Sequence, residues 1–498
     1  MYRSRHKEDL DRRTLNFLSS IEIDDKILFY DILCSKAHVI MLYKIHILNK
    51  FEFATIVNAL DQILRNPERL VREGFEDIHE AVEAHLIGKI GVDIGGKIQT
   101  GRSRNDQIVT DIKIKARDDL ISIIFHLINL IRLLLEKSEE NLDSIMPLYT
   151  HLQQAQNGNL AHYLLSYSES LLREVERLFS LYKRINQSPL GAGPIGGSLL
   201  PLDRKMTAKL LGFENIVSNT IDATSSRDFM IEFLSDISSI MITLSRCAED
   251  LIIWSSEEFG FIEIHEKFTS TSSAMPQKKN PDPLEMIRSK TALVIGNFTS
   301  VMIILKALPS GYSRDLQDTK LSFWNSIDTV SLSLEIVTGI IASLVVNKDV
   351  MATASNASYA TAFDVAEELV IRHKVPFRTA HKLVGALVAK AIRNKEEVPF
   401  KSLSNSDVKL ILEKMKLSMP PAKVIHIIKD MTPQKSIANR RSEGSPNPRK
   451  QMKTIKKYRI LLDNYHNQVQ SKKKNVEYVQ ENIIAVINQI KTKAYSSL

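Results

Sequence analysis

The stretch LISIIFHLINLIRLLL, residues 120–135, is apolar on nearly every face when its residues are set at helical spacing. His126, Asn129 and Arg132 interrupt it, so it is not a good membrane span. A helix that is apolar all round must be surrounded by other helices, either of its own chain or of a partner subunit. The stretch therefore predicts a helical bundle and makes an oligomer plausible.

The rest of the chain also favours helix, because Gly and Pro are sparse, at 18 and 16 among 498 residues. Apolar periodicity predicts further long helices over 160–185, 228–259, 283–305 and 320–346. We expect an all-α protein with three helical domains, the central one a bundle of five long helices. The predicted parts are an N-terminal domain at 1–105, a central bundle at 106–350, a small C-terminal domain at 351–450 and a basic helical extension at 451–498.

Positive charge is concentrated at the end of the chain. Of 66 Lys and Arg and 58 Asp and Glu, residues 449–498 hold 11 and 3, which leaves 55 of each sign before them. Apolar periodicity at 458–462 and 479–490 favours a solvated helical face over nucleic-acid binding. The opening MYRSRHKEDLDRR lacks an apolar leader, and Cys34 and Cys247 lie in apolar helical surroundings, so we expect a reducing, cytoplasmic location.

The segment TSTSSAMPQKKNPD, residues 269–282, separates two of these helices and differs from both. Its hydroxyl side chains compete for backbone hydrogen bonds and have little to bury, so we expect a mobile loop suited to a lid. Lys278, Lys279 and Asn280 offer donors for a carboxylate. From composition alone, a solvated basic linker is the alternative interpretation.

Several motifs together resemble a known family. SSAMPQKKNP is similar to the signature loop of the fumarase and aspartase superfamily, whose members eliminate fumarate from succinyl-containing substrates. The chain resembles one branch of this superfamily, argininosuccinate lyase, at four further motifs. They are QTGRSRNDQ at 99–107, THLQQAQ at 150–156, SRDLQDTK at 313–320 and PFRTAHKLVG at 376–385. FEDIHEAVE, SPLGAGPIGGSLLPLDR and SSRDF follow the family order as well. The resemblance extends from about residue 15 to about residue 448.

The resemblance implies residue roles. Ser272 is the implied base, Lys278 stabilises the anion, and His151 is the acid, oriented by Glu285. His79 and Thr150 are further candidates to contact the substrate or to act as a general acid. The implied substrate-binding residues are Ser20, Asp77, His79, Arg104, Asn105, Thr150, Asn280, Tyr312, Arg314, Gln317 and Lys320. The resemblance also implies a homotetramer whose active sites each take motifs from three subunits, and argininosuccinate as the substrate. No cofactor or metal is expected, since the elimination requires none.

These residue types fit that chemistry. Argininosuccinate carries three carboxylates, an ammonium and a guanidinium, so its site needs several anion donors and at least one carboxylate. The elimination passes through a carbanion whose charge needs fixed donors. A serine hydroxyl is a weak acid, so we hypothesise that lid closure places Ser272 in a dry, cation-rich pocket near Lys278. Gln317 and Lys320 are three residues apart and share one face if their segment is helical.

The chain departs from the family pattern at several places. Thr271 stands where the family has Gly, and the usual N-terminal WGGRF is missing. Gln99, Asn157, Ser226 and Ser313 also replace family residues. Alternative functions are adenylosuccinate lyase, which GRSRNDQ and RDLQDTK disfavour, a non-catalytic crystallin-like descendant, and a nucleic-acid-binding scaffold that rests only on the basic extension. GVDIGGK lacks the Ser or Thr of a phosphate loop, and the histidines of HEAVEAH are spaced wrongly for zinc.

Overall fold

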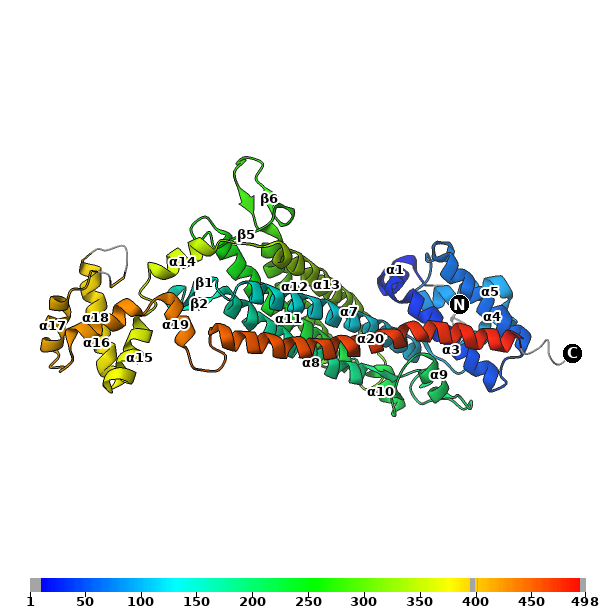
Figure 1. The fold of residues 1–498 in the computed structure, drawn as a ribbon. Coiled ribbons are helices and arrows are strands. Elements are labelled where there is room, and N and C mark those ends of the chain that lie inside the picture. The colour runs from blue at the N-terminus through cyan, green and yellow to red at the C-terminus, as the bar shows by residue number, and fades with distance from the viewer. Residues whose placement is uncertain (1–9, 395–398, 401, 493–498) are drawn as a thin grey trace.

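The chain forms an elongated helical protein with one small domain at each end of a long bundle (Figure 1). The computed structural model describes residues 10–394, 399–400 and 402–492. Strands in this part of the chain occur only as short two-stranded pairs. The predicted all-α class is therefore confirmed, because neither the bundle nor either end domain is built on a sheet.

The N-terminal domain packs its helices around α3, which is buried along most of its length. The Asn49 side chain begins α4 by accepting from the backbone N–H of Glu52, and the backbone N–H of Asn49 donates to the Glu52 carboxylate. The helices of this domain are α1 Arg12–Leu18, α2 Ile21–Asp24, α3 Leu28–Lys44, α4 Lys50–Arg65, α5 Ile78–Ile90 and α6 Val92–Gly95, with 3-10 turns at Asp25–Ile27, Pro67–Arg69 and Gly96–Gln99.

The central bundle consists of the five long helices that the periodicity predicts. They are α7 Arg104–Glu140, α8 Leu160–Ile185, α11 Asp228–Ser255, α12 Asp282–Leu305 and α13 Thr319–Ser343. Ser103 caps α7 in a capping box with Asp106, which fixes where the longest bundle helix begins. The stretch Arg314–Ser343 is long and apolar enough to cross a membrane, but its helix α13 packs against α7, α11 and α12. It is better explained as a core helix.

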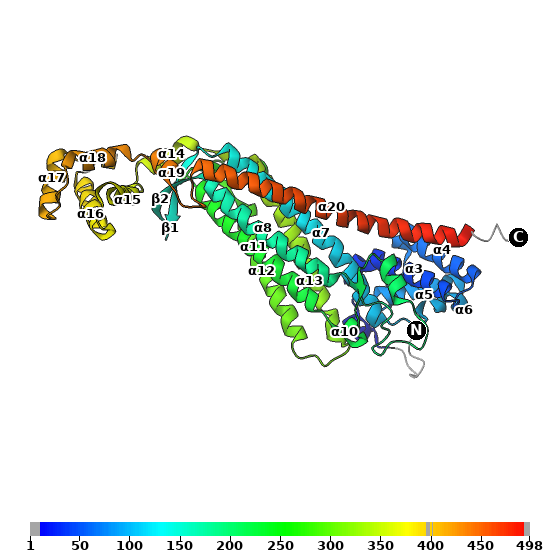
Figure 2. The same cartoon turned by 60° about the horizontal axis from the view of Figure 1, so that its bottom comes forward.

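The basic extension forms α20, Pro448–Thr492, which runs back along the bundle to the N-terminal domain (Figures 1 and 2). Its apolar side, which includes Ile455, Leu462 and Ile483, is buried, and it contacts α7, α3 and α4. Lys456 and Lys457 are exposed, as expected of a solvated helical face.

The position of α20 shows which of the two expected kinds of helix covers residues 120–135. That stretch of α7 is enclosed by α8, α13 and α20 of the same chain, and Ile123, Leu127 and Ile131 have no exposed surface. Most of this segment is therefore buried by helices of its own chain, while Phe125 remains 37% exposed. Sequence periodicity identified the buried segment but could not tell which helices would cover it.

The small domain at the other end has its own core, built around Leu369, Leu383, Leu387 and Val424. Its helices and the connecting α14 are α14 Lys348–Asn356, α15 Ala362–His373, α16 Phe377–Arg393, α17 Asn405–Lys414, α18 Pro421–Asp430 and α19 Pro433–Asn439. The domain boundaries given above remain predictions.

Short strands and helices connect the long ones. Strand β1, Ile145–Thr150, pairs antiparallel with β2, Gln153–Asn159, from Ile145 opposite Asn159 to Thr150 opposite Gln153. Gly158 is required there, because a Cβ atom would lie 2.7 Å from the Leu148 side chain. The other elements are α9 Arg204–Leu210, α10 Thr220–Ser225, β3 Gln187–Ser188, β4 Asn215–Ile216, β5 Ile262–Glu263, β6 Ser270–Thr271, β7 Lys279–Asn280 and β8 Val345–Val346.

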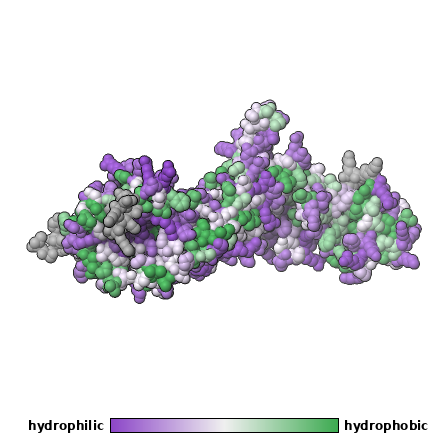
Figure 3. Space-filling view, turned by 180° about the vertical axis from the view of Figure 1, so that it is seen from behind, coloured by the Kyte–Doolittle hydropathy of each residue, from purple (hydrophilic) through white to green (hydrophobic). Residues whose placement is uncertain are grey.

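One bundle helix, α12, leaves much apolar surface uncovered. Met286, Leu293 and Ile303 are 48%, 61% and 56% exposed. Figure 3 shows apolar patches interrupting the hydrophilic surface of the molecule. A bundle helix with so much exposed apolar surface is typical of a subunit interface.

Candidate active site

The first group of predicted site residues lies where the bundle meets the N-terminal domain. Lys320, in the first turn of α13, is fully buried and donates to the Ser20 hydroxyl at 3.0 Å and to Asp24. Ser20 in turn donates to Asp24 at 2.7 Å. The structure thus joins two predicted residues that are 300 positions apart. Sequence reasoning missed Asp24, although its spacing of four from Ser20 on a helical segment was a usable signal.

Arg314 and Gln317 reach the same N-terminal segment as Lys320. Both side chains donate to the backbone oxygen of Leu18, at 2.9 Å and 2.8 Å. Arg314 also donates to the Glu76 carboxylate at 3.0 Å. The 3-10 turn at Arg314–Gln317 followed by α13 turns all three side chains toward residues 18–24. The expectation of a shared direction for Gln317 and Lys320 is confirmed.

Arg104, the first residue of α7, lies among carboxylates. Its guanidinium donates to Asp77 at 2.9 Å and lies 3.7 Å from Glu76 and 3.6 Å from Glu80. Asp77 also caps α5 by accepting from the backbone N–H of Glu80 at 2.8 Å. Burial raises the pKa of Asp77, but the positive charges of His79 and Arg104 outweigh it and lower that pKa overall.

Three further residues complete this first group, which we call the junction cluster and define as Ser20, Asp24, Glu76, Asp77, Arg104, Asn105, Arg227, Tyr312, Arg314, Gln317 and Lys320. Asn105 donates to the backbone oxygen of Pro194 in the Gly-rich loop at 2.9 Å. Burial raises the pKa of Tyr312 against the opposing charges of Arg227 and Arg314. Arg227 is itself buried, which lowers its pKa to about 10. Sequence reasoning noted SSRDF but gave Arg227 no role.

His79 differs from the other predicted substrate-binding residues. Its side chain is completely buried, and Nδ1 lies 3.1 Å from Asp31 and 3.6 Å from Asp111. It therefore faces the interior between α3, α5 and α7 and not the surface of the junction cluster.

The second group lies on a hairpin that projects from the bundle (Figure 1). β6 and β7 pair, with Ser270 opposite Asn280, so the expected loop has a short regular stem. Near its tip, the Ser272 hydroxyl accepts from the backbone N–H groups of Ala274 and Met275 at 3.2 Å and 3.1 Å. Lys278 is exposed. These two predicted catalytic residues therefore lie at the two ends of the loop that joins β6 and β7.

Two more predicted residues lie at the base of this hairpin. Asn280, in β7, donates to the Ser270 hydroxyl at 3.4 Å. Glu285 is exposed on the first turn of α12. The hairpin residues 270–280 together with Glu285 are called the lid below.

The third group is the turn between β1 and β2. His151 and Leu152 have φ angles of 55° and 57°, a left-handed conformation that costs a residue with a side chain about 1–2 kcal/mol. Paired positive φ angles match the twist of a two-residue hairpin but favour Asn and Gly. Thr150 and His151 are both exposed there. A strained histidine at an exposed tip supports a functional role for this turn.

Within one chain, the junction cluster lies far from the other two groups. The lid lies at the start of α12 and the junction cluster lies beyond its end, and a helix of 24 residues is about 36 Å long. Similarly, the 37 residues of α7 hold Arg104 about 55 Å from the hairpin that carries His151.

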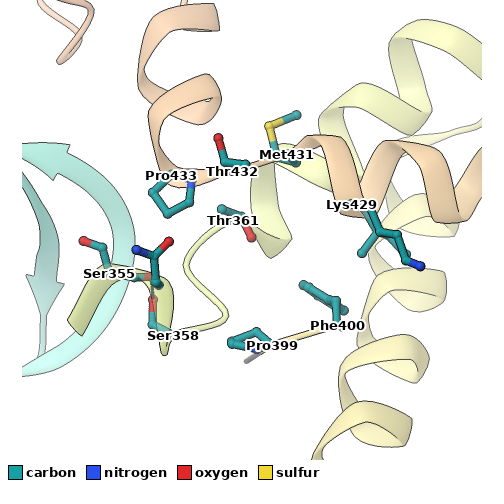
Figure 4. A pocket seen from close by; sticks show the side chains of 11 residues that line it. Ser355, Ser358, Thr361, Pro399, Phe400, Lys429, Met431, Thr432 and Pro433 are labelled. Carbon is teal, nitrogen blue, oxygen red and sulfur yellow. Dashed lines mark hydrogen bonds between the residues drawn. The ribbon is translucent and has the colours of Figure 1, made fainter. Parts of the chain in front are cut away.

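A separate cavity of about 390 Å³ lies in the C-terminal domain (Figure 4). Its lining residues are Ser355, Asn356, Ser358, Thr361, Pro399, Phe400, Ile428, Lys429, Met431, Thr432 and Pro433. These residues include none of the three groups above, so we do not assign the cavity to the reaction.

The chain is similar to known proteins over nearly its whole length. Residues 11–296 match a family model described as lyase, and residues 359–426 match one described as argininosuccinate lyase C-terminal. The argininosuccinate lyase of Nitrosopumilus maritimus is 43% identical, covering 97% of this chain and 100% of its own. That of Methanocaldococcus jannaschii is 38% identical, covering 96% and 97%. The crystal structure of an EDDS lyase in complex with formate superposes with a TM-score of 0.87 at 27% identity, covering 98% and 96%.

A five-helix bundle with polar clusters at its two ends, together with these matches, defines a lyase of the fumarase and aspartase type. The relatives are similar over nearly the whole chain and not only at the motifs. The chain belongs to the argininosuccinate lyase family.

Proposed function

We propose that this protein cleaves argininosuccinate reversibly to arginine and fumarate, the last step of arginine biosynthesis. The junction cluster is the observation that carries the proposal. It combines guanidinium, ammonium and amide donors with carboxylates, as in the pairs Arg104 with Asp77 and Arg314 with Glu76. Argininosuccinate presents the complementary mixture of three carboxylates, an ammonium and a guanidinium.

The proposed reaction is a β-elimination. Ser272 removes the proton from the carbon next to the C–N bond that will break, and the electron pair of that C–H bond spreads into the neighbouring carboxylate. Lys278 and amides of the lid stabilise this carbanion. The pair then forms the C=C bond of fumarate, and the C–N electrons leave with the guanidinium nitrogen. His151, oriented by Glu285, supplies a proton to that nitrogen, so the proton balance closes.

We further propose that each site is assembled from three subunits of a homotetramer in the cytoplasm. The separation of about 36 Å along α12 supports this, because one chain cannot bring its lid to its own junction cluster while the helix stays intact. The exposed Leu293 and Ile303 of α12 supply apolar surface for association. Light scattering of the purified protein tests the proposal, and a monomer with full activity would refute it.

Fumarate absorbance tests the activity. Purified protein should release fumarate from argininosuccinate and not from adenylosuccinate. Release from adenylosuccinate alone would assign the related lyase activity instead. If neither substrate reacts while the protein is a folded tetramer, the crystallin-like structural function becomes the better explanation.

A further inference from the structure

A compact group of ionisable side chains lies buried behind the junction cluster. Asp31 of α3, His79 of α5 and Asp111 of α7 are fully buried, and their ligand-type atoms lie within 4.8 Å of one another. His79 Nδ1 is 3.1 Å from Asp31 and 3.6 Å from Asp111. Gln107, also on α7, donates to the same oxygen of Asp31. The group therefore ties together three helices that are far apart in sequence.

The surrounding charges suit a protonated imidazole. Burial alone would lower the pKa of His79, but Asp31 in the first place, then Asp77 and Asp111, raise it to about 9. Burial raises the pKa of Asp111 well above its usual value, and the nearby Asp31 carboxylate adds to this. Asp31 keeps a lowered pKa, since His79 and Arg102 outweigh its burial. The ion pair that these pKa shifts favour, called the firm pair below, therefore joins the Asp31 carboxylate to the His79 imidazolium.

Other polar groups facing this pair come from each packed element. Arg102, in the turn before α7, is buried and donates to Ser35 of α3 at 3.0 Å. Cys34 of α3 lies beside Asp111, and burial raises the pKa of its thiol, so it stays neutral. His79 carries a positive charge at the start of α5, where the helix dipole disfavours it. That unfavourable position persists because Asp31 compensates it.

This buried group lies directly behind substrate-binding candidates. Asp77 precedes His79 by two residues, and Arg104 precedes Gln107 by three on α7. The 2.9 Å contact between Arg104 and Asp77 therefore spans the two helices that the buried group holds together. Any slide of α5 against α7 changes that contact first.

We propose that the Asp31–His79–Asp111 group is a positioning unit, in which the His79 ring clamps α5 to α3 and α7 and thereby fixes Asp77 and Arg104 for substrate binding. This makes His79 a positioning residue and not a residue that touches substrate. The inference rests on the proposed function, because it assigns the unit to that same site.

The same side chains could in principle hold a divalent cation. Asp111 and His79 Nε2 have no hydrogen-bond partner within the described part of the chain. However, His79 Nδ1 and Gln107 both direct donors at Asp31, and the Arg102 guanidinium is close to both carboxylates. Positive charge and N–H donors that already face these carboxylates oppose the binding of a divalent cation there. Metal binding is therefore an outcome to test and not the interpretation we favour.

The experiment compares four variants of the full-length tetramer at 25 °C. Asp31→Asn and His79→Asn remove the firm pair but keep similar shapes. Asp111→Asn imitates the protonated carboxyl. Asp364→Asn is the matched control, because Asp364 is also buried and binds Arg440 at 3.0 Å, but in the C-terminal domain. Steady-state kinetics, thermal unfolding and amide hydrogen exchange are measured for each.

We expect Asp31→Asn and His79→Asn to raise KM for argininosuccinate at least about tenfold, with a smaller change in kcat, because a displacement near 1 Å is enough for such a loss. Asp111→Asn should stay within about twofold of wild type. Asp364→Asn should lower the melting temperature without changing KM. In the first two variants, exchange should accelerate at 104–107 and 77–80 while the central bundle stays protected.

Three results would overturn the proposal. One is an unchanged KM with a lower melting temperature in His79→Asn, which would indicate only a structural role. Another is a rise in KM for Asp111→Asn that equals the rise for Asp31→Asn. The third is one equivalent of divalent metal in the purified protein that His79→Asn loses. If the wild-type protein releases no fumarate, the proposed function fails. Amide hydrogen exchange at residues 104–107 still tests whether the buried group holds the start of α7 in place.

Discussion

Two inactive variants should restore activity to each other if they assemble together. Ser272→Ala removes the proposed base from the lid, and Arg104→Gln removes a guanidinium from the junction cluster. In one chain these residues lie beyond opposite ends of α12, a separation of about 36 Å. In the proposed tetramer, a working site combines the lid of one subunit with the junction cluster of another.

The size of the recovery follows from this arrangement. In tetramers formed at random from equal amounts of the two variants, half of the lids carry Ser272 and half of the junction clusters carry Arg104. If the two groups of each site come from different subunits, about a quarter of the sites contain both residues. Co-expressed protein should therefore show about 25% of wild-type turnover per tetramer.

The assay is fumarate release by doubly tagged, co-purified tetramers. The matched control combines Ser272→Ala with Lys278→Met, two changes in the same lid. No lid in that mixture contains both side chains, so activity should stay at the level of the single variants. The subunit-sharing argument would be wrong if the Ser272 and Arg104 pair recovered nothing, or if the two-lid control recovered as much.

Three further predictions concern single changes. Ser272→Ala should lower turnover at least about 100-fold yet change the free energy of unfolding by less than about 1 kcal/mol, because its half-buried hydroxyl accepts only weak local bonds from the backbone of Ala274 and Met275; calorimetry together with the fumarate assay checks both. The raised pKa of His79 means that its charge stabilises the fold fully below about pH 6.5 and that this contribution is lost as pH rises through about 9. Urea unfolding should therefore show wild type losing more stability than His79→Asn between pH 7 and pH 10, on the order of 2 kcal/mol, and equal losses would contradict a charged ring. Ile483→Ala should cost about 2–5 kcal/mol, since this residue of α20 is fully buried, and a loss under about 1 kcal/mol would mean that α20 does not pack as described.

Much of the candidate site could be read from local sequence. The motifs placed Arg104, Arg314, Gln317 and Lys320 among the donors, and the structure gathers all four at the junction. Motif reasoning works there because these side chains are carried on short rigid turns at helix starts. Their roles in binding and catalysis remain predictions until the variants are measured.

Other site features depended on distant parts of the chain. Asp24 accepts from Lys320, which is 296 residues further along, and Arg227 lies near Tyr312, whose segment folds back beside it. His79 matched a motif, yet its ring turns inward to Asp31 and Asp111. Whether a polar side chain near a site faces substrate or core depends on its neighbours, which a single sequence does not give.

The sequence by itself determined the helical class, the positions of the five long helices and the motifs of the family, because backbone periodicity and turn chemistry act over a few residues. Only the tertiary structure decided that α20 covers α7, that α12 keeps an exposed apolar face, and that lid and junction cluster lie at opposite ends of one helix. The physical reason is that burial is a relation between segments: periodicity tells which face of a helix is apolar, and packing alone selects what covers it.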